Sequence, residues 1–130
     1  MTNDRSTDVI GQVVAEIYAR LGEPITIDDM ARSAMYSKFH FTRMFQQAIG
    51  VPPGRFLTSV RFREAERLLL STSLSVTEIA ERVGYSSLGT FSAKFKSTFG
   101  LSPSVYRDLA VYAEPVSGAP VSGAKLRKRP

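Results

Sequence analysis

The sequence predicts an all-α fold of about seven helices, in which two helix-turn-helix subdomains are joined by a long linker helix. Three observations support this prediction. An uninterrupted helical pattern follows the prolines at positions 52 and 53, a second pattern occurs twice along the chain, and helix-capping residues stand at corresponding places in both copies. The repeat is the strongest of the three, because chance rarely aligns so many apolar positions at one offset.

The linker helix is expected over residues 53–71. A proline suits the first turn of a helix, where the missing N–H costs nothing, and neither Gly nor Pro interrupts the run from Arg55 to Ser71. Its apolar residues spread over more than half of a helical wheel, which is wider than the stripe of an ordinary surface helix. The helix should therefore be covered on two sides. Arg61 falls on the apolar side, and since a buried arginine is usually paired, we expect a structural ion pair there.

The two copies of the repeat correspond residue by residue. Five positions match at an offset of 50: Ser37 with Ser87, Phe41 with Phe91, Phe45 with Phe95, Gly50 with Gly100 and Pro53 with Pro103. Upstream of these positions the offset is 49, so the second copy has one inserted residue. Two short helices joined by a tight turn make a helix-turn-helix, which we place at residues 26–50 and again at residues 75–100.

Capping residues mark the start of each of these helices. Thr26 and Ser75 are followed three residues later by Asp29 and Glu78, which is the pattern of a capping box. In each copy a serine then caps the second helix, and a glycine ends it. The same order of capping residues therefore occurs in both copies.

The segments before and after the repeat complete the expected organisation. Residues 1–8 are expected to be disordered, with Asp8 capping a helix from Val9 to Leu21 that covers the first helix-turn-helix. A closing helix is expected over residues 103–112, so that one folded region covers 9–112. Three residues of the closing helix are expected in the second core: Val105, Tyr106 and Leu109. Residues 113–130 contain PVSGA twice and then four basic residues, which is typical of a flexible basic tail.

The distribution of charge says more than its total. The chain has 17 basic and 12 acidic residues and a formal net charge of +5, but four of the basic residues lie in the expected tail. Net charge is therefore a weak guide to function. Positive charge gathers on the second helix of each copy and on the linker helix, as a phosphate-binding face requires.

Composition argues against catalysis and against metal or cofactor binding. The chain has no Cys and a single His, His40, so no thiolate or His-cluster metal site is expected. It has no nucleophile–base pair or phosphate loop, so we expect no enzyme and no cofactor. No apolar run reaches the length of a membrane span or a signal peptide, so we expect a cytoplasmic protein without a membrane partner.

Residues 75–107, SVTEIAERVGYSSLGTFSAKFKSTFGLSPSVYR, resemble the signature of the AraC/XylS family of bacterial transcription regulators. Residues 36–45, YSKFHFTRMF, are similar to the small single-domain members of the MarA and SoxS type, which lack a sensory domain. The resemblance covers about residues 9–109. It implies an AraC-type DNA-binding domain, with double-stranded DNA as the partner and activation through contact with RNA polymerase.

The length of the linker helix suits binding by a monomer. About 19 residues at ~1.5 Å each span ~28 Å, and successive major-groove faces of B-DNA lie ~34 Å apart. One chain could therefore place both recognition helices on one face of the duplex. We expect a monomer bound to an asymmetric promoter site.

In the first copy, the second helix is expected to turn one face to the core and the other to DNA. The core face carries Phe41, Phe45 and Ile49. Arginine can bond guanine O6 and N7, threonine can offer a hydroxyl or a methyl, and an aromatic ring can press on a thymine methyl. Four outer residues, at positions that match the base-reading positions of the family, are expected to contact bases: Phe39, Thr42, Arg43 and Gln46. Lys38 and His40 are expected to contact phosphate, which is also the alternative for Arg43.

The second copy departs from the family pattern. Its outward positions include Leu88, Gly89 and Ala93, where family members often carry Gln, Thr or Arg. We therefore expect this half to give phosphate and shape contacts more than direct base reading. One residue, Thr90, is the expected base contact. Four residues are expected to contact phosphate: Ser87, Ser92, Lys94 and Lys96.

Together these features predict a sequence-specific DNA-binding transcription regulator, expected to be an activator and to be associated with the nucleoid. The alternative is a protein-binding adaptor or anti-activator that kept the fold and lost specific DNA readout. The small and apolar residues on the outer face of the second copy would suit that alternative. Salt-dependent binding to duplex DNA at micromolar levels would separate the two functions.

Overall fold

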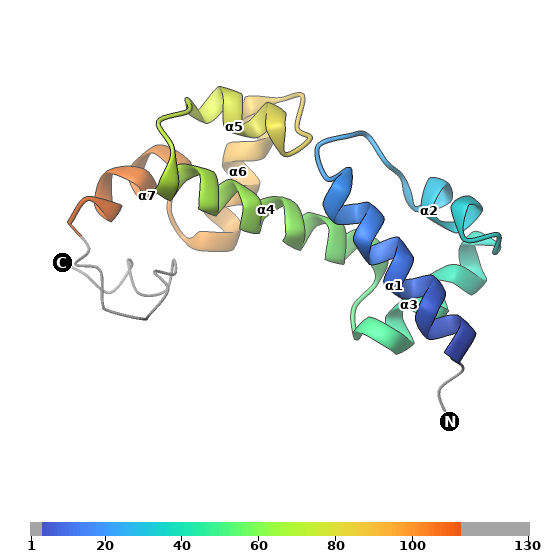
Figure 1. The fold of residues 1–130 in the computed structure, drawn as a ribbon. Coiled ribbons are helices and arrows are strands. Elements are labelled where there is room, and N and C mark those ends of the chain that lie inside the picture. The colour runs from blue at the N-terminus through green and yellow to red at the C-terminus, as the bar shows by residue number, and fades with distance from the viewer. Residues whose placement is uncertain (1–3, 113–130) are drawn as a thin grey trace. The chain divides into compact units, whose positions relative to one another are not determined.

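The computed structural model describes residues 4–112, which form seven helices and no strand (Figure 1). The predicted all-α class is therefore confirmed over this range. The disorder expected at residues 1–3 and the tail expected at residues 113–130 lie outside the described residues. The chain falls into two compact units, with the division between Arg63 and Glu64, inside the linker helix.

The first unit is built from four helical segments: α1 (Asp4–Ala19), α2 (Ile27–Ser33), α3 (Lys38–Ile49) and the first part of α4 (Pro53–Ser71). Both α1 and α2 pack against α3, and Figure 1 shows α1 beside α3. All four segments contribute side chains to one apolar core, which includes Ile17, Met30, Phe41 and Val60. The expected cover of the first helix-turn-helix by the N-terminal helix is therefore confirmed.

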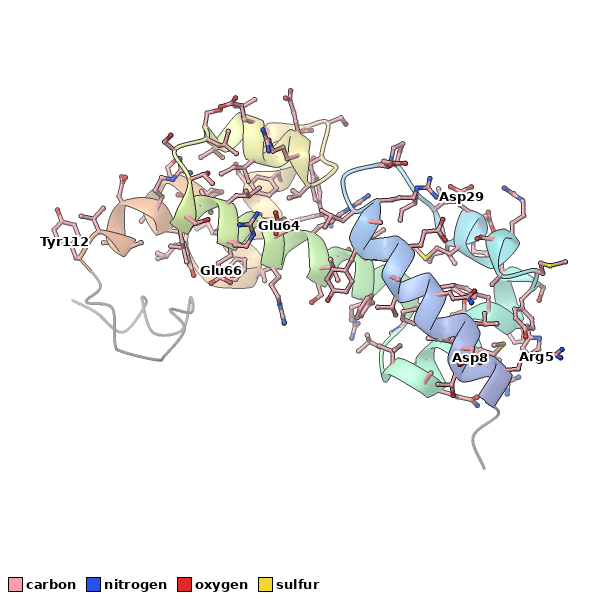
Figure 2. The ribbon with its side chains drawn as sticks, in the orientation of Figure 1. Arg5, Asp8, Asp29, Glu64, Glu66 and Tyr112 are labelled. Carbon is pink, nitrogen blue, oxygen red and sulfur yellow. The ribbon has the colours of Figure 1, made fainter. Side chains whose placement is uncertain are left out.

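The second unit is built from the rest of α4 and three further helices: α5 (Val76–Arg82), α6 (Leu88–Phe99) and α7 (Pro103–Ala110). Helix α6 packs against both α5 and α7. The ring centroids of Phe95 and Tyr106 lie 5.4 Å apart in an edge-to-face contact. The Tyr106 hydroxyl donates a hydrogen bond to the carboxylate of Glu66, which Figure 2 labels on α4.

The start of α1 corrects the prediction for the N-terminus. The helix begins at Asp4, so the expectation of disorder is wrong for residues 4–8, and Asp8 lies inside the helix rather than at its cap (Figure 2). An acidic residue is favourable both at a cap and in the first turns of a helix, so Asp8 did not define the boundary. The helix also ends at Ala19, two residues earlier than expected, and it buries Ile10 with Val13 and Ile17.

Two residues expected in the cores are exposed. Ile49 is 38% exposed and Val105 is 44% exposed. Ile49 is the last residue of α3, where the chain leaves the core at Gly50. Val105 lies beside the buried Tyr106 on the short helix α7, and the residue 50 positions upstream, Arg55, is also exposed. The repeat therefore already indicated an outward position for Val105.

The predicted helix caps are confirmed. In the first copy, the Asp29 N–H donates to Thr26 Oγ1 at 3.0 Å, and the Thr26 N–H donates to Asp29 Oδ2 at 3.0 Å. The corresponding distances between Ser75 and Glu78 are 3.0 and 2.9 Å. The glycines at positions 50 and 100 end α3 and α6 with φ of 100° and 87°, in the region where side chains other than glycine are disfavoured.

Two arginines tie a loop to a helix, one in each unit. The Arg61 guanidinium donates to the carbonyls of Leu21 and Glu23, both at 2.7 Å. Arg61 therefore has a structural role through these two loop carbonyls, while the ion pair that we expected for it stays a prediction. In the second unit, Arg107 makes the same kind of contact with three loop and helix-end carbonyls: Leu69 at 3.1 Å, Leu74 at 2.6 Å and Thr72 at 3.2 Å.

Candidate nucleic-acid interface

Helix α3 divides cleanly into a buried and an exposed side. Phe41 and Phe45 are fully buried, and Met44, which the sequence analysis did not place in the core, is buried with them. The Ser37 hydroxyl caps the helix by accepting a hydrogen bond from the His40 N–H at 3.2 Å. Core packing and this cap fix the rotation of α3, so the residues between the buried positions are held on its outer side.

The four expected base contacts of the first unit all lie on α3 away from its buried side. Phe39, Arg43 and Gln46 are exposed, and Thr42 is half-buried. The Arg43 guanidinium carbon lies 5.7 Å from the centroid of the Phe39 ring, in a cation–π contact. The Thr42 hydroxyl donates to the carbonyl of Lys38 at 2.8 Å. This bond occupies the hydroxyl proton and leaves a methyl group and an oxygen lone pair for an outside partner.

The two expected phosphate contacts of the first unit lie at the start of α3. Lys38 is exposed and forms no ion pair among the described residues. His40 is also exposed, and its ring lies 5.0 Å from that of Tyr36 in an edge-to-face contact. Both side chains are therefore accessible, as a role at the DNA backbone requires.

Helix α6 presents a smaller and less polar outer side than α3. Phe91 and Phe95 are fully buried, and Leu88 is 44% exposed. A Cβ placed on Gly89 would meet only the hydroxyl of Ser87, at 3.8 Å, so the surface there is open. The Ser87 hydroxyl accepts a hydrogen bond from the Thr90 N–H at 3.2 Å. Ser87 therefore caps α6 through its hydroxyl oxygen, and its hydroxyl proton can still be donated to a phosphate.

The other expected contacts of the second unit lie on α6 as well. Thr90, Lys94 and Lys96 are exposed, and Ser92 is half-buried. Neither lysine forms an ion pair within residues 4–112. This helix therefore offers two accessible positive charges and short polar groups, but no long side chain with the planar fork that reads a base edge by two hydrogen bonds.

Some of the basic side chains counted in the sequence are bound to groups within their own unit. Arg107 is bound to carbonyls, as described above, so it does not belong to a free basic face. Arg67 donates from Nε and Nη2 to the carboxylate of Glu64, at 2.9 and 2.7 Å, and these bonds lower the pKa of Glu64. On α4, Arg55 and Arg63 are exposed and have no ion-pair partner in the part of the chain that the structure describes.

One acidic residue of α2, Asp29, and one of α5, Glu78, are engaged in the caps of their own helices. The Thr26 N–H, as a donor to Asp29, lowers the pKa of that carboxyl, and the Ser75 N–H lowers the pKa of Glu78 in the same way. Both carboxylates therefore stay ionised and bound to backbone at neutral pH. Their negative charge complements the N-terminal ends of α2 and α5.

Two exposed residues on or next to α3, Gln47 and Met35, were not predicted from the sequence. Gln47 is exposed and lies four residues after Arg43, on the same side of α3, so helical spacing alone could have added it to the candidates. Met35 is 90% exposed in the turn before α3 and has a positive φ of 65°. The residue that corresponds to Met35 in the second copy, at an offset of 49, is Gly84, with φ of 94°. A glycine at this place in the repeat could have indicated a positive φ at Met35.

Comparison with known proteins agrees with this arrangement. A helix-turn-helix domain family matches residues 30–108. The HTH-type transcriptional activator AarP of Providencia stuartii is 33% identical over 101 residues, which cover 78% of this chain and 75% of AarP. Several other curated relatives are longer, and the chain spans 27% to 34% of their length.

Two solved structures extend the comparison to the fold. A transcriptional regulator from Chromobacterium violaceum, described as containing an AraC-type DNA-binding domain, has a TM-score of 0.74 and 29% identity, covering 88% of this chain and 100% of that one. The DNA-binding domain of AdpA, solved with a target DNA, has a TM-score of 0.73 and 32% identity, covering 76% of this chain and 89% of that one. No helix within residues 4–112 is long and apolar enough to cross a membrane. The chain belongs to the AraC-type family of helix-turn-helix transcription regulators, which bind DNA and are not a class of enzymes.

Proposed function

We propose that this regulator is a transcription activator that binds an asymmetric promoter site as a monomer and reads its bases mainly through α3. The observation that carries this proposal is the exposed Phe39–Arg43 pair, which projects from a helix whose other side is fixed in the core. A rigid helix with an outward guanidinium suits insertion into the major groove. Cytoplasmic location at the nucleoid belongs to the same proposal.

In the first unit, each outer residue of α3 has a chemical role on DNA. Arg43 would donate two hydrogen bonds to guanine O6 and N7, and Gln46 would pair with an adenine edge. Thr42, whose hydroxyl proton is bound to the Lys38 carbonyl, would offer its methyl to a thymine methyl or its oxygen to an amino group. Phe39 would cover a thymine methyl, while Lys38 and His40 would contact phosphate.

In the second unit, α6 would contribute affinity more than sequence reading. Ser87, Ser92, Lys94 and Lys96 would contact phosphate, and Thr90 would be the single base contact. Phosphate contacts release counterions and stabilise binding on any sequence, but they carry no direct base information. The short side chains at Gly89 and Ala93 support this division, because neither can reach a base edge with a polar group.

Activation is supported by relatives rather than by geometry. The name of AarP describes that protein as a transcriptional activator, and activation by this chain would need a contact with RNA polymerase. Binding as a monomer is supported by the duplicated sequence, since one chain carries two helix-turn-helix units, each with its own recognition helix. A protomer that holds both recognition helices needs no second copy to occupy two groove segments.

The experiment that tests this function begins with selection of bound duplexes from a random DNA library by the wild-type chain. Arg43→Ala should then lose about 1–3 kcal/mol of binding free energy on the selected site, and far less on random DNA, because a bidentate guanine contact is lost only on the cognate sequence. Arg32→Ala is the control: it removes an exposed arginine of α2, which pairs with Asp29 at 3.5 Å, and should affect both DNAs little.

The outcomes separate the candidate functions. Equal losses on cognate and random DNA would make Arg43 a phosphate contact. If the chain selected no consensus and showed no salt-dependent binding at micromolar concentrations, the adaptor or anti-activator function would replace DNA reading. The exposed Leu88 and the small residues beside it on α6 are the features that such a protein-binding role would use.

A further inference from the structure

Phe39 is an unusual residue to leave in water. Its ring is 73% exposed, although a phenylalanine is more often buried. It lies in the first turn of α3, four residues before Arg43, and residues at this spacing are neighbours on a helix surface. The Arg43 guanidinium carbon lies over the ring, 5.7 Å from its centroid. The ring therefore has a defined partner before any DNA is present.

The contact has a physical consequence for Arg43. The face of an aromatic ring carries negative charge and attracts a guanidinium. An exposed arginine otherwise samples many rotamers, and this freedom is lost when it binds a base, which weakens binding. No carboxylate competes for the guanidinium, since Arg43 forms no ion pair among residues 4–112. Within the described residues, the guanidinium therefore has the Phe39 ring as a partner and no carboxylate.

The geometry points to Phe39 as a positioning residue that holds the Arg43 guanidinium ready to read guanine. This inference rests on the proposed function of Arg43 and extends it, because it makes base discrimination at one position depend on a second side chain. It differs from a thymine contact by Phe39, which would need only an apolar surface. The pair exists in the first unit alone, since the residues 50 positions later are Gly89 and Ala93.

Two substitutions separate an aromatic from an apolar role. Phe39→Leu keeps an apolar side chain but removes the ring face, whereas Phe39→Trp keeps a ring that attracts cations at least as well. We expect Phe39→Leu to lower the preference for guanine over the other bases at the Arg43 position by about two- to five-fold. Phe39→Trp should keep the preference for guanine at the Arg43 position, because the ring face is still present. In the Arg43→Ala background, Phe39→Leu should have no further effect on the preference at the Arg43 position.

A measurement on the free protein tests the geometry without DNA. The Phe39 ring current should shift the NMR signals of the Arg43 side-chain protons upfield in the wild type. Phe39→Leu should remove this shift and Phe39→Trp should keep it. Because the Phe39 side chain is exposed, thermal unfolding should be nearly the same for all three proteins, which controls for a folding defect.

The results distinguish failure of this inference from failure of the proposed function. Absence of the ring-current shift in the wild type would overturn the positioning role whatever the DNA results. A loss of guanine preference in Arg43→Ala but not in Phe39→Leu would also overturn it, and would leave base reading by Arg43 intact. An equal effect of Phe39→Leu with and without Arg43 would show that Phe39 acts directly on a base, which again overturns positioning.

Discussion

Met35 is the one residue other than glycine with a positive φ among the residues that the structure describes. It occupies the turn between α2 and α3, and the corresponding residue of the second unit is Gly84. An L side chain in this left-handed region costs roughly 1–2 kcal/mol, whereas glycine adopts it freely. The Met35 side chain is 90% exposed, so it recovers little of this cost by burial.

Met35→Gly should therefore stabilise the first unit. We expect a gain of about 0.5–1 kcal/mol in the free energy of unfolding, because relief of the backbone strain is partly offset by the larger conformational entropy of glycine in the unfolded chain. Met35→Ala is the control, since it removes the same side chain and keeps the strain. Denaturant unfolding measures both, and a Gly variant no more stable than the Ala variant would contradict the strain argument.

At the scale of single residues, the sequence predicted most of the two cores and most of the exposed side of α3. Periodicity identified Phe41, Phe45, Phe91 and Phe95, all fully buried. It could not tell where a helix leaves the core, and Ile49 was misplaced for that reason. Nor could it show which arginines are already bound, because the carbonyl partners of Arg107 are 33 to 38 residues away in the sequence.

At the scale of elements, helices were predicted best where a cap or a proline marked their start. The linker helix was expected at 53–71 and α4 spans Pro53–Ser71. The start of α1 was missed because several polar residues there suit a helix equally well. A residue-by-residue comparison of the repeats could not predict that Arg61 and Arg107 make the same kind of contact. The two residues lie one helical turn away from equivalence, since the position matching Arg107 is Leu57, four residues before Arg61.

The capping boxes predict how stability depends on pH. Asp29 and Glu78 have pKa values below their ordinary values of 3.8 and 4.5, mainly because the N–H groups of Thr26 and Ser75 donate to the carboxylates. As pH falls through this range, the unfolded chain takes up protons before the folded chain does, so the folded state is destabilised. The contribution of the caps should be complete above about pH 5 and should be lost progressively below about pH 4.

The measurement is thermal unfolding between pH 6 and pH 3. An Asp29→Asn, Glu78→Gln variant should show a shallower fall in melting temperature than the wild type over the acid half of this range, because it has no carboxylate to protonate at either cap. Asp28→Asn is the control, since Asp28 is adjacent in sequence but lies outside the capping box. A variant with the wild-type pH dependence would show that the caps do not contribute to acid sensitivity.

At the scale of the whole molecule, the two copies share one fold but differ in the residues on their outer sides. Capping boxes, core phenylalanines and terminal glycines occur at corresponding positions in both copies. The outer residues are not: Phe39 and Arg43 correspond to Gly89 and Ala93. Residues that fix a fold are constrained by packing and hydrogen bonding, so their positions could be predicted from the sequence. Outer residues are constrained by the partner, so their roles on DNA remain a prediction.

This asymmetry predicts that the two halves of the DNA site contribute unequally. Randomising a critical base pair under the first unit should cost about 1–3 kcal/mol of binding free energy, whereas randomising pairs under the second should cost much less, because phosphate contacts do not distinguish bases. Lys94→Ala and Lys96→Ala should weaken binding on all sequences alike, and each should reduce the slope of affinity against salt by about one. Site selection followed by titration at two salt concentrations measures both effects. A consensus with two equally strong boxes about one helical turn apart would refute the prediction, since it would mean that α6 reads bases directly despite its short side chains.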